Sequence, residues 1–120
     1  MKKQIIISST NELVRVLPER IVYISSDGNY SSIVQTDGEV RMVSYQLGNI
    51  ETLISKQLGK EYSRQFIRIG RSMIINRSYV YYINISRQQL KLSDIRTFSH
   101  TVSASKEALR QLKEEIEKSI

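Results

Sequence analysis

Residues 21–44 read IVYISSDGNYSSIVQTDGEVRMVS, and short runs of Ile, Val and Tyr in this stretch are separated by turn-forming residues. Runs of β-branched and aromatic residues bounded by Gly, Asn and Asp are typical of antiparallel strands. We therefore expect strands over Ile21–Ser25, Tyr30–Thr36 and Glu39–Ser44. The dipeptide Asp37-Gly38 predicts a type I′ hairpin turn between the last two, because this turn needs a positive φ at both central residues.

The residues before this stretch predict a first hairpin. Its strands, Gln4–Ser8 and Leu13–Leu17, flank the turn-forming Ser9-Thr10-Asn11. Pro18 is expected to end the second strand, because proline has no N–H for the ladder.

After residue 44 the apolar residues take the spacing of one helix face. We expect Ser44 to cap this helix, Gly59 to end it and Lys60–Gln65 to form a polar connection. The amphipathic tail Lys106–Lys118 predicts a second helix, capped by Ser103 or Ser105. Strands are expected between the two helices at Phe66–Ile69, Met73–Ile75, Tyr79–Ile85, Gln89–Leu92, Arg96–Phe98 and Thr101–Val102. The fold class is thus mainly β, with one helix between strands and one at the C-terminus.

The composition is that of a basic chain of domain size. With 120 residues, 40% of them hydrophobic, we expect one domain over residues 1–120. Eighteen Lys and Arg against twelve Asp and Glu give a net charge of +6, which favours a polyanionic partner. The absence of cysteine excludes disulfides and thiolate chemistry. No apolar run approaches the ~20 residues of a membrane span and no signal peptide is evident, so we expect a cytoplasmic protein without membrane contact.

The sequence offers little for catalysis. The only histidine, His100, lies near Ser99 and Asp94, but sequence proximity does not make a triad, and there is no Gly-x-Ser-x-Gly elbow. One histidine with scattered carboxylates matches no zinc or EF-hand spacing, and the glycines form no phosphate-binding fingerprint. We therefore expect no catalytic residue, no cofactor, no metal and no small-molecule substrate.

Residues 66–80, FIRIGRSMIINRSYV, are more informative, because three arginines interrupt an apolar stretch. Gly70-Arg71-Ser72 has the composition of a loop tip between two strands. An arginine at such a tip can make a bidentate contact with guanine, and Ser72 can donate to phosphate. The structural alternative is that Arg68, Arg71 and Arg77 lie on a solvated strand face or pair with Glu39, Glu51 or Glu61.

Two motifs together resemble the LytTR DNA-binding domain family of bacterial transcriptional regulators. Residues 21–31, IVYISSDGNYS, are similar to the family's strand that leads into a Gly-Asn-Tyr turn. Residues 66–76, FIRIGRSMIIN, are similar to its Phe-Ile-Arg-x-His-Arg-Ser-x-x-Val-Asn segment. The helix between the motifs and the closing strands also match, so the resemblance extends over residues 4–115.

The resemblance implies an elongated, mainly antiparallel β fold that binds double-stranded DNA through three loops, enters successive major grooves and bends the duplex. In these loops Asn29 suits adenine, Arg71 suits guanine and Lys106 suits phosphate, whereas Ser103 either contacts DNA or caps the helix. Matched residue by residue, the expected DNA contacts are Asn29, Tyr30 and Ser31 in the first loop, Arg68, Arg71 and Ser72 in the second, and Ser103 and Lys106 in the third.

The chain departs from the family in two ways. Gly70 stands where the family usually has histidine, which removes one side-chain contact and predicts a more flexible loop. No receiver domain precedes the first strand, which predicts a free-standing regulator or a piece of a longer one, acting as a homodimer on DNA or with a partner regulator.

Two other functions stay open. One is a protein-interaction module that pairs with a related full-length regulator or inhibits it. The other is binding of single-stranded nucleic acid, in which exposed aromatic rings stack on the bases. The candidate rings are Tyr30, Tyr79, Tyr81 and Tyr82.

Overall fold

The structure, a computed structural model, describes residues 3–120, and it describes only the backbone of Glu61 and Tyr62. The helices are α1 (Leu47–Ser63) and α2 (Lys106–Glu117), with short 3₁₀ turns at Pro18–Arg20 and Arg77–Tyr79. The strands are β1 (Ile5–Ser8), β2 (Leu13–Val16), β3 (Ile21–Asp27), β4 (Tyr30–Gln35), β5 (Val40–Val43), β6 (Phe66–Ile69), β7 (Met73–Asn76), β8 (Val80–Asn84), β9 (Gln89–Ser93) and β10 (Ser99–Ser103).

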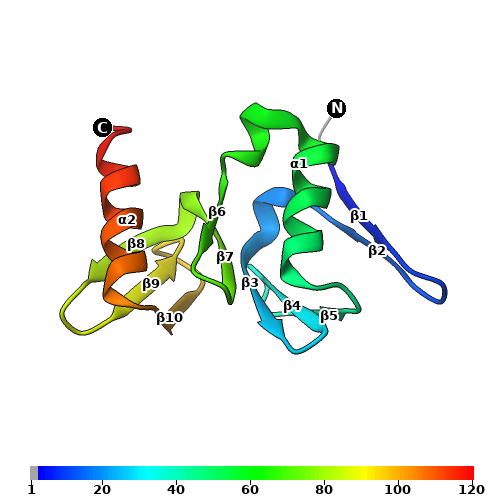
Figure 1. Cartoon of the computed structure of the whole chain (residues 1–120), viewed down its shortest axis with the longest axis horizontal. Coiled ribbons are helices and arrows are strands. Elements are labelled where there is room, and N and C mark those ends of the chain that lie inside the picture. Colours follow the sequence, from blue (N-terminus) through cyan, green and yellow to red (C-terminus); the bar gives the residue numbers. More distant parts are fainter. Residues whose placement is uncertain (1–2) are drawn as a thin grey trace.

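These strands form three antiparallel sheets. β1 and β2 make a two-stranded hairpin, and a five-stranded sheet has the order β5-β4-β3-β7-β6. The remaining strands make a three-stranded sheet of order β10-β9-β8. Figure 1 shows the five-stranded sheet in the middle of the molecule, with α1 and the hairpin on one side and the three-stranded sheet with α2 on the other. The predicted mainly β fold with two helices is confirmed.

The five-stranded sheet separates two hydrophobic cores. Successive side chains of a strand point to opposite faces, so Ile74 of β7 joins one core and Ile75 the other. The first core lies under α1 and the β1–β2 hairpin, and the second lies between the sheet, the three-stranded sheet and α2. β7 is covered on both faces, and its residues 73–75 are therefore all apolar instead of alternating with polar ones.

Side-chain hydrogen bonds attach the β1–β2 hairpin to α1. The amide of Gln57 accepts from the Ile6 N–H and donates to the Ile6 carbonyl, each at 2.8 Å. These two bonds satisfy backbone groups on the outer edge of β1, where a further strand would otherwise pair. The first predicted hairpin is therefore present and is held in place by a helix.

The predicted start of α1 was wrong, whereas the first helical stretch does end at the predicted Gly59. The Gln46 carbonyl accepts the first helical N–H groups, from Asn49 and Ile50, so the cap position is Gln46 and not Ser44. Gly59 has a φ of 80° and a ψ of 168°, which interrupts the helix, but the chain turns helical again up to Ser63. The glycine thus produces a kink, and part of the expected connection is helical.

The Asp37-Gly38 hairpin is confirmed, but its predicted type I′ turn was wrong. Only Gly38 has a positive φ, of 86°. The Gly38 N–H donates to the Gln35 carbonyl, and the Gln35 N–H donates to the Glu39 carbonyl, both at 3.0 Å. This is a three-residue loop with glycine in the left-handed position, which spares Asp37 a strained conformation.

The expected strand at Arg96–Phe98 was also wrong, because Asp94 folds these residues into a turn. Its Oδ1 accepts from the N–H groups of Arg96, Thr97 and Phe98 at 2.9, 2.7 and 3.1 Å. Backbone groups bonded in this way are not available to a ladder. The last strand is instead the single element β10, which includes the predicted Thr101–Val102.

The Asp94 turn makes stability depend on pH. Hydrogen bonds, first from the Thr97 hydroxyl and then from the backbone, hold the pKa of Asp94 well below its ordinary 3.8. A lowered pKa stabilises the fold above the ordinary value and loses this effect as the pH falls. We expect Asp94→Ala to lower the midpoint of thermal unfolding at neutral pH, and the difference from the parent protein to shrink below about pH 5. A pH-independent difference would contradict this role for the carboxylate.

Candidate nucleic-acid interface

The first two predicted loops lie at the same end of the strands of the five-stranded sheet. The β3–β4 turn lies between the paired residues Asp27 and Tyr30. β3 also pairs with β7, where Ser25 is opposite Met73. The β6–β7 loop precedes Met73, so both hairpin tips project from the end of the sheet where β3 finishes. A hydrogen bond of 2.9 Å from the Ser26 N–H to the Ser72 carbonyl joins them.

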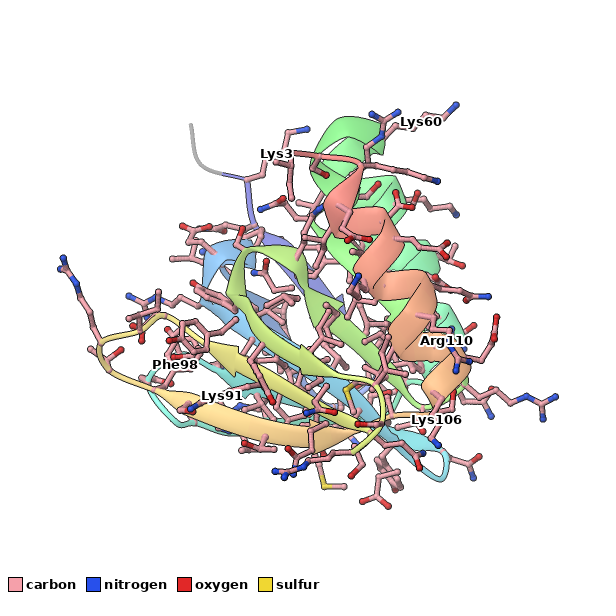
Figure 2. The ribbon with its side chains drawn as sticks, turned by 90° about the vertical axis from the view of Figure 1, so that its left-hand side faces the viewer. Lys3, Lys60, Lys91, Phe98, Lys106 and Arg110 are labelled. Carbon is pink, nitrogen blue, oxygen red and sulfur yellow. The ribbon has the colours of Figure 1, made fainter. Side chains whose placement is uncertain are left out.

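The third predicted loop, residues 103–106, joins β10 to α2. It lies on the same side of the molecule as the two hairpin tips, the lower side in Figure 1. Figure 2 shows Lys106 at the lower end of α2, with Lys60 at the opposite end of the molecule. The three loops therefore share one side of a molecule that measures 43 × 33 × 27 Å along its principal axes.

In the first loop the three predicted residues have different surroundings. Asn29 and Tyr30 are exposed, and the Asn29 Oδ1 accepts from Gln46 Nε2 at 3.4 Å. Ser31 is completely buried, and its hydroxyl donates to the Tyr45 carbonyl at 2.7 Å. Asn29 and Tyr30 are thus open to a ligand, whereas Ser31 ties β4 to the segment that precedes α1.

The turn that carries Asn29 needs a glycine before it. Gly28 has a φ of 64°, and Asn29 is not among the residues with positive φ. A positive φ at the first central position alone is the pattern of type II′ hairpin turns. This turn places the Asn29 side chain at the tip of the hairpin, next to the start of α1.

Arg68 braces the second loop. Its Nε donates to the Gly70 carbonyl at 3.2 Å, and its Nη2 donates to the Arg71 carbonyl at 3.1 Å. Its Nη1 pairs with Glu51 Oε1 of α1 at 3.0 Å. The structural alternative thus holds for Arg68, with Glu51 as partner; the side chain of Glu61 lies outside the described residues.

Arg71 and Ser72 are exposed at the tip of the second loop. Among the side chains that the structure describes, the Arg71 guanidinium has neither a hydrogen-bond nor an ion-pair partner. Gly70 before it has a φ of 58°, and a Cβ at this position would meet no atom within 4 Å. The loop therefore presents Arg71 freely, while Arg68 holds the backbone beneath it.

The third loop resolves which serine caps α2. The Ser105 hydroxyl accepts from the Ala108 N–H at 3.1 Å, so Ser105 is the cap and Ser103 is not needed for this role. Ser103 and Lys106 are both exposed. In the described part of the chain, the Lys106 ammonium has no acidic partner within ion-pair distance.

Other polar residues singled out in the sequence have structural surroundings. Arg77 donates to the Glu115 carbonyl at 2.9 Å and to the Ser119 hydroxyl, at the end of α2. His100 packs on Tyr23 and Phe98, with ring centroids 5.7 and 5.8 Å away. These contacts leave Asp94, His100 and Ser99 without the mutual hydrogen bonds of a triad.

Tyr79 also differs from the other candidate tyrosines. Its ring meets Phe98 edge-on at 5.0 Å, and its hydroxyl donates to the Glu19 carbonyl at 2.5 Å. Burial, followed by the charges of Asp94 and Glu19, raises the pKa of Tyr79. Tyr30, Tyr81 and Tyr82 are the exposed ones, at 49%, 54% and 46%.

Two other kinds of site are absent from the described residues, a membrane-spanning helix and a metal site. Among residues 3–120, no helix is long and apolar enough to cross a membrane. Among the side chains that the structure describes, which leave out that of Glu61, no three His, Asp or Glu gather so that they could hold a metal ion.

Comparisons with known proteins address the family. The chain is similar to a solved LytTr DNA-binding domain of a protein described as a methyl-accepting/DNA response regulator from Bacillus cereus. The two are 18% identical, the match covers 97% of this chain and 98% of that one, and the TM-score is 0.66, which is a likeness of fold. No curated protein sequence matches the chain. The LytTr DNA-binding domain family matches residues 11–117, nearly the whole chain. The chain therefore belongs to the LytTr DNA-binding domain family.

Proposed function

We propose that this chain is a sequence-specific regulator of transcription that reads the major groove of double-stranded DNA through three loops. The observation that carries the proposal is that all three loops lie on one side of the molecule. Two of them present a cation, Arg71 or Lys106, that has no acidic partner among the described side chains. Free cations on one face are the electrostatic footprint of a polyanion-binding protein. We further propose that residues 1–120 act as one domain, in the cytoplasm and without catalysis.

The size of the molecule supports contacts in successive grooves. One turn of duplex DNA rises about 34 Å. The longest dimension of the molecule is 43 Å, so one protein can span the distance between two major grooves on the same side of a duplex. Loops at the two ends of the lower side are then able to contact different grooves.

The residues have distinct roles in this proposal. Arg71 reads a guanine through two hydrogen bonds, and Asn29 reads an adenine, steadied by Gln46. Lys106, Ser72, Ser103 and Tyr30 contact the phosphate backbone. Arg68 and Ser31 support the loops without contacting DNA, because their polar groups are already bonded to the carbonyls of Arg71 and Tyr45.

Selection of binding sites from random duplexes tests the proposal. The purified chain is mixed with a random duplex pool at moderate salt, and bound molecules are amplified and sequenced over several rounds. We expect one recurring sequence element, whose affinity falls with salt at a log–log slope of about −0.9 for each phosphate neutralised. Recovery of unenriched sequences would contradict base-specific reading.

One observation favours the second candidate, a protein-interaction module. The edge strand β5 exposes the apolar side chains of Val40 and Met42, at 55% and 47%. The selection, together with a gel shift of a related regulator on its own DNA, separates the two functions. A module that pairs with a related regulator would retain no duplex from the pool, yet would shift the mobility of that regulator's own DNA complex.

A further inference from the structure

The outer face of the three-stranded sheet carries only side chains of the kinds that bind a nucleic-acid backbone. Leu90, Leu92 and Val102 point into the second core, so the residues between them point outward. We call the outward set the outer face, and it consists of Tyr82, Asn84, Gln89, Lys91, Ser93, Ser99, Thr101 and Ser103. Lys, Ser, Thr, Asn, Gln and Tyr side chains are those that contact phosphate and sugar in protein–DNA complexes. The outer face contains no acidic residue.

The strand register connects this face to the proposed DNA surface. Lys91 is paired with Thr101 and Gln89 with Ser103, and all four side chains lie on the same face. Ser103 belongs to the third loop, two residues before the α2 cap. The outer face is therefore continuous with the third loop, and Figure 2 shows Lys91 and Lys106 on the same three-stranded sheet and helix unit.

Two cations lie at the far end of the outer face. Lys91 Nζ is 5.6 Å from the centre of the Tyr81 ring, and Arg96 is exposed in the neighbouring turn. Both line a pocket of about 370 Å³ together with the hydroxyl-bearing residues Ser93, Thr97 and Ser99. The one nearby carboxylate, of Asp94, is turned inward onto the backbone N–H groups of its own turn. The Ser93 and Thr97 hydroxyls donate to the Phe98 carbonyl and to Asp94. An anion entering the pocket thus meets the positive charge of Lys91 and Arg96 and the hydroxyl of Ser99.

The turn that presents Arg96 is rigid. Asp94 accepts three backbone hydrogen bonds within it, and the Ile95 N–H donates to the Ser93 hydroxyl at 2.8 Å. Ile95 has a φ of 71°, a left-handed conformation that a β-branched residue seldom adopts, yet its side chain is 74% exposed. Strain of this kind persists where the surroundings hold it, often at ligand-binding segments. These bonds fix the backbone from which the exposed Arg96 side chain extends.

We propose that the outer face is a second contact surface for the duplex, on which Lys91 and Arg96 bind phosphates that flank the site read by the three loops. The proposal rests on the proposed function, because the flanking duplex is the same molecule that the loops read. It adds sequence-independent affinity on one side of the site, and it leaves base reading to Arg71 and Asn29.

The test compares two variants on three duplexes. The double variant Lys91→Gln and Arg96→Gln removes both cations but keeps a polar side chain with the first two methylene groups, and it keeps the backbone bonds to Asp94. Lys60→Gln is the matched control, because Lys60 is an exposed cation on the opposite side of the molecule. The duplexes carry the selected site with long flanks, or with the flank removed from one end or from the other.

For the parent protein and for Lys60→Gln, we expect removal of one flank, and not of the other, to weaken binding. The double variant should bind the long duplex as weakly as the parent protein binds the shortened one, and should lose nothing more when that flank is removed. Its log–log salt slope should be shallower by about 0.9 for each cation removed. The enriched base sequence should be unchanged, and thermal unfolding of each variant checks that the fold is kept.

Other outcomes would overturn the proposal. Equal affinity of the double variant and the parent protein on the long duplex would show that the outer face does not bind DNA, while the parent's binding would leave the proposed function standing. Failure of the parent protein to bind any duplex would instead contradict the proposed function itself.

Discussion

Replacing Arg71 with alanine is expected to weaken binding to the selected duplex about 5- to 150-fold, or about 1–3 kcal/mol. The guanidinium is exposed and has no partner in the described structure, so its removal costs the fold little. Its loss removes both hydrogen bonds to one guanine. Titration of the variant against the selected duplex, and against duplexes changed at single positions, should show relaxed preference at one base pair.

Lys106→Ala is the matched control for this prediction. Lys106 is also an exposed cation on the DNA side, but its place at the start of α2 suits a phosphate. Its loss should weaken binding to selected and random duplexes alike and make the salt slope shallower by about one. If Arg71→Ala also weakens all sequences equally, Arg71 is a backbone contact and base reading lies elsewhere.

Ile75→Ala is expected to lower the free energy of unfolding by about 2–5 kcal/mol. Ile75 is 0% exposed on β7, an inner strand of the five-stranded sheet, and it contributes to the second core between this sheet and the three-stranded sheet. Alanine removes three carbon atoms there and leaves a cavity that the paired strands cannot close. Since domains of this size unfold with about 5–15 kcal/mol, the loss is a large fraction of the total. Urea unfolding followed by circular dichroism measures it.

The control for Ile75→Ala is Val40→Ala on the edge strand β5. Val40 is 55% exposed, so the same kind of truncation should change the free energy of unfolding by no more than about 0.5 kcal/mol. A loss below about 1 kcal/mol for Ile75→Ala would mean that the two halves of the molecule close around the missing atoms.

Much of the fold follows from local pattern. Most strand positions, both helices and the Asp37-Gly38 hairpin follow from apolar spacing and turn residues, which act within a few positions of the chain. The wrongly predicted strand at Arg96–Phe98 lies where a side chain redirects the backbone. Asp94 draws three N–H groups into a turn in place of that strand. The outcome depends on whether a side chain or a neighbouring strand bonds these N–H groups, and the spacing of apolar residues does not indicate which.

The candidate site was predictable in part for the same reason. Loop tips such as Gly28-Asn29 and Gly70-Arg71 have a local signature, so their residues were found in the sequence. The different roles of Arg68 and Arg71 were not, because the partner of Arg68 is Glu51 on α1, 17 residues away. Local pattern also does not indicate the proposed role of Lys91, since the sheet face on which it lies forms only when β9 pairs with β10.

The sequence alone thus determined a basic, mainly β chain with two helices and cation-bearing loop tips, because strand and helix periodicity and turn chemistry are local properties. Tertiary structure decided the rest. Pairing of β3 with β7 brings two loops from distant parts of the chain to one sheet edge, and packing of α2 on the second core places Lys106 on the same side. Those contacts join residues far apart in the chain, and their free energy comes from burying both faces of one sheet. Neither the β3–β7 pairing nor the packing of α2 can be inferred from a short stretch of residues, including residues 21–44, from which the fold was first inferred.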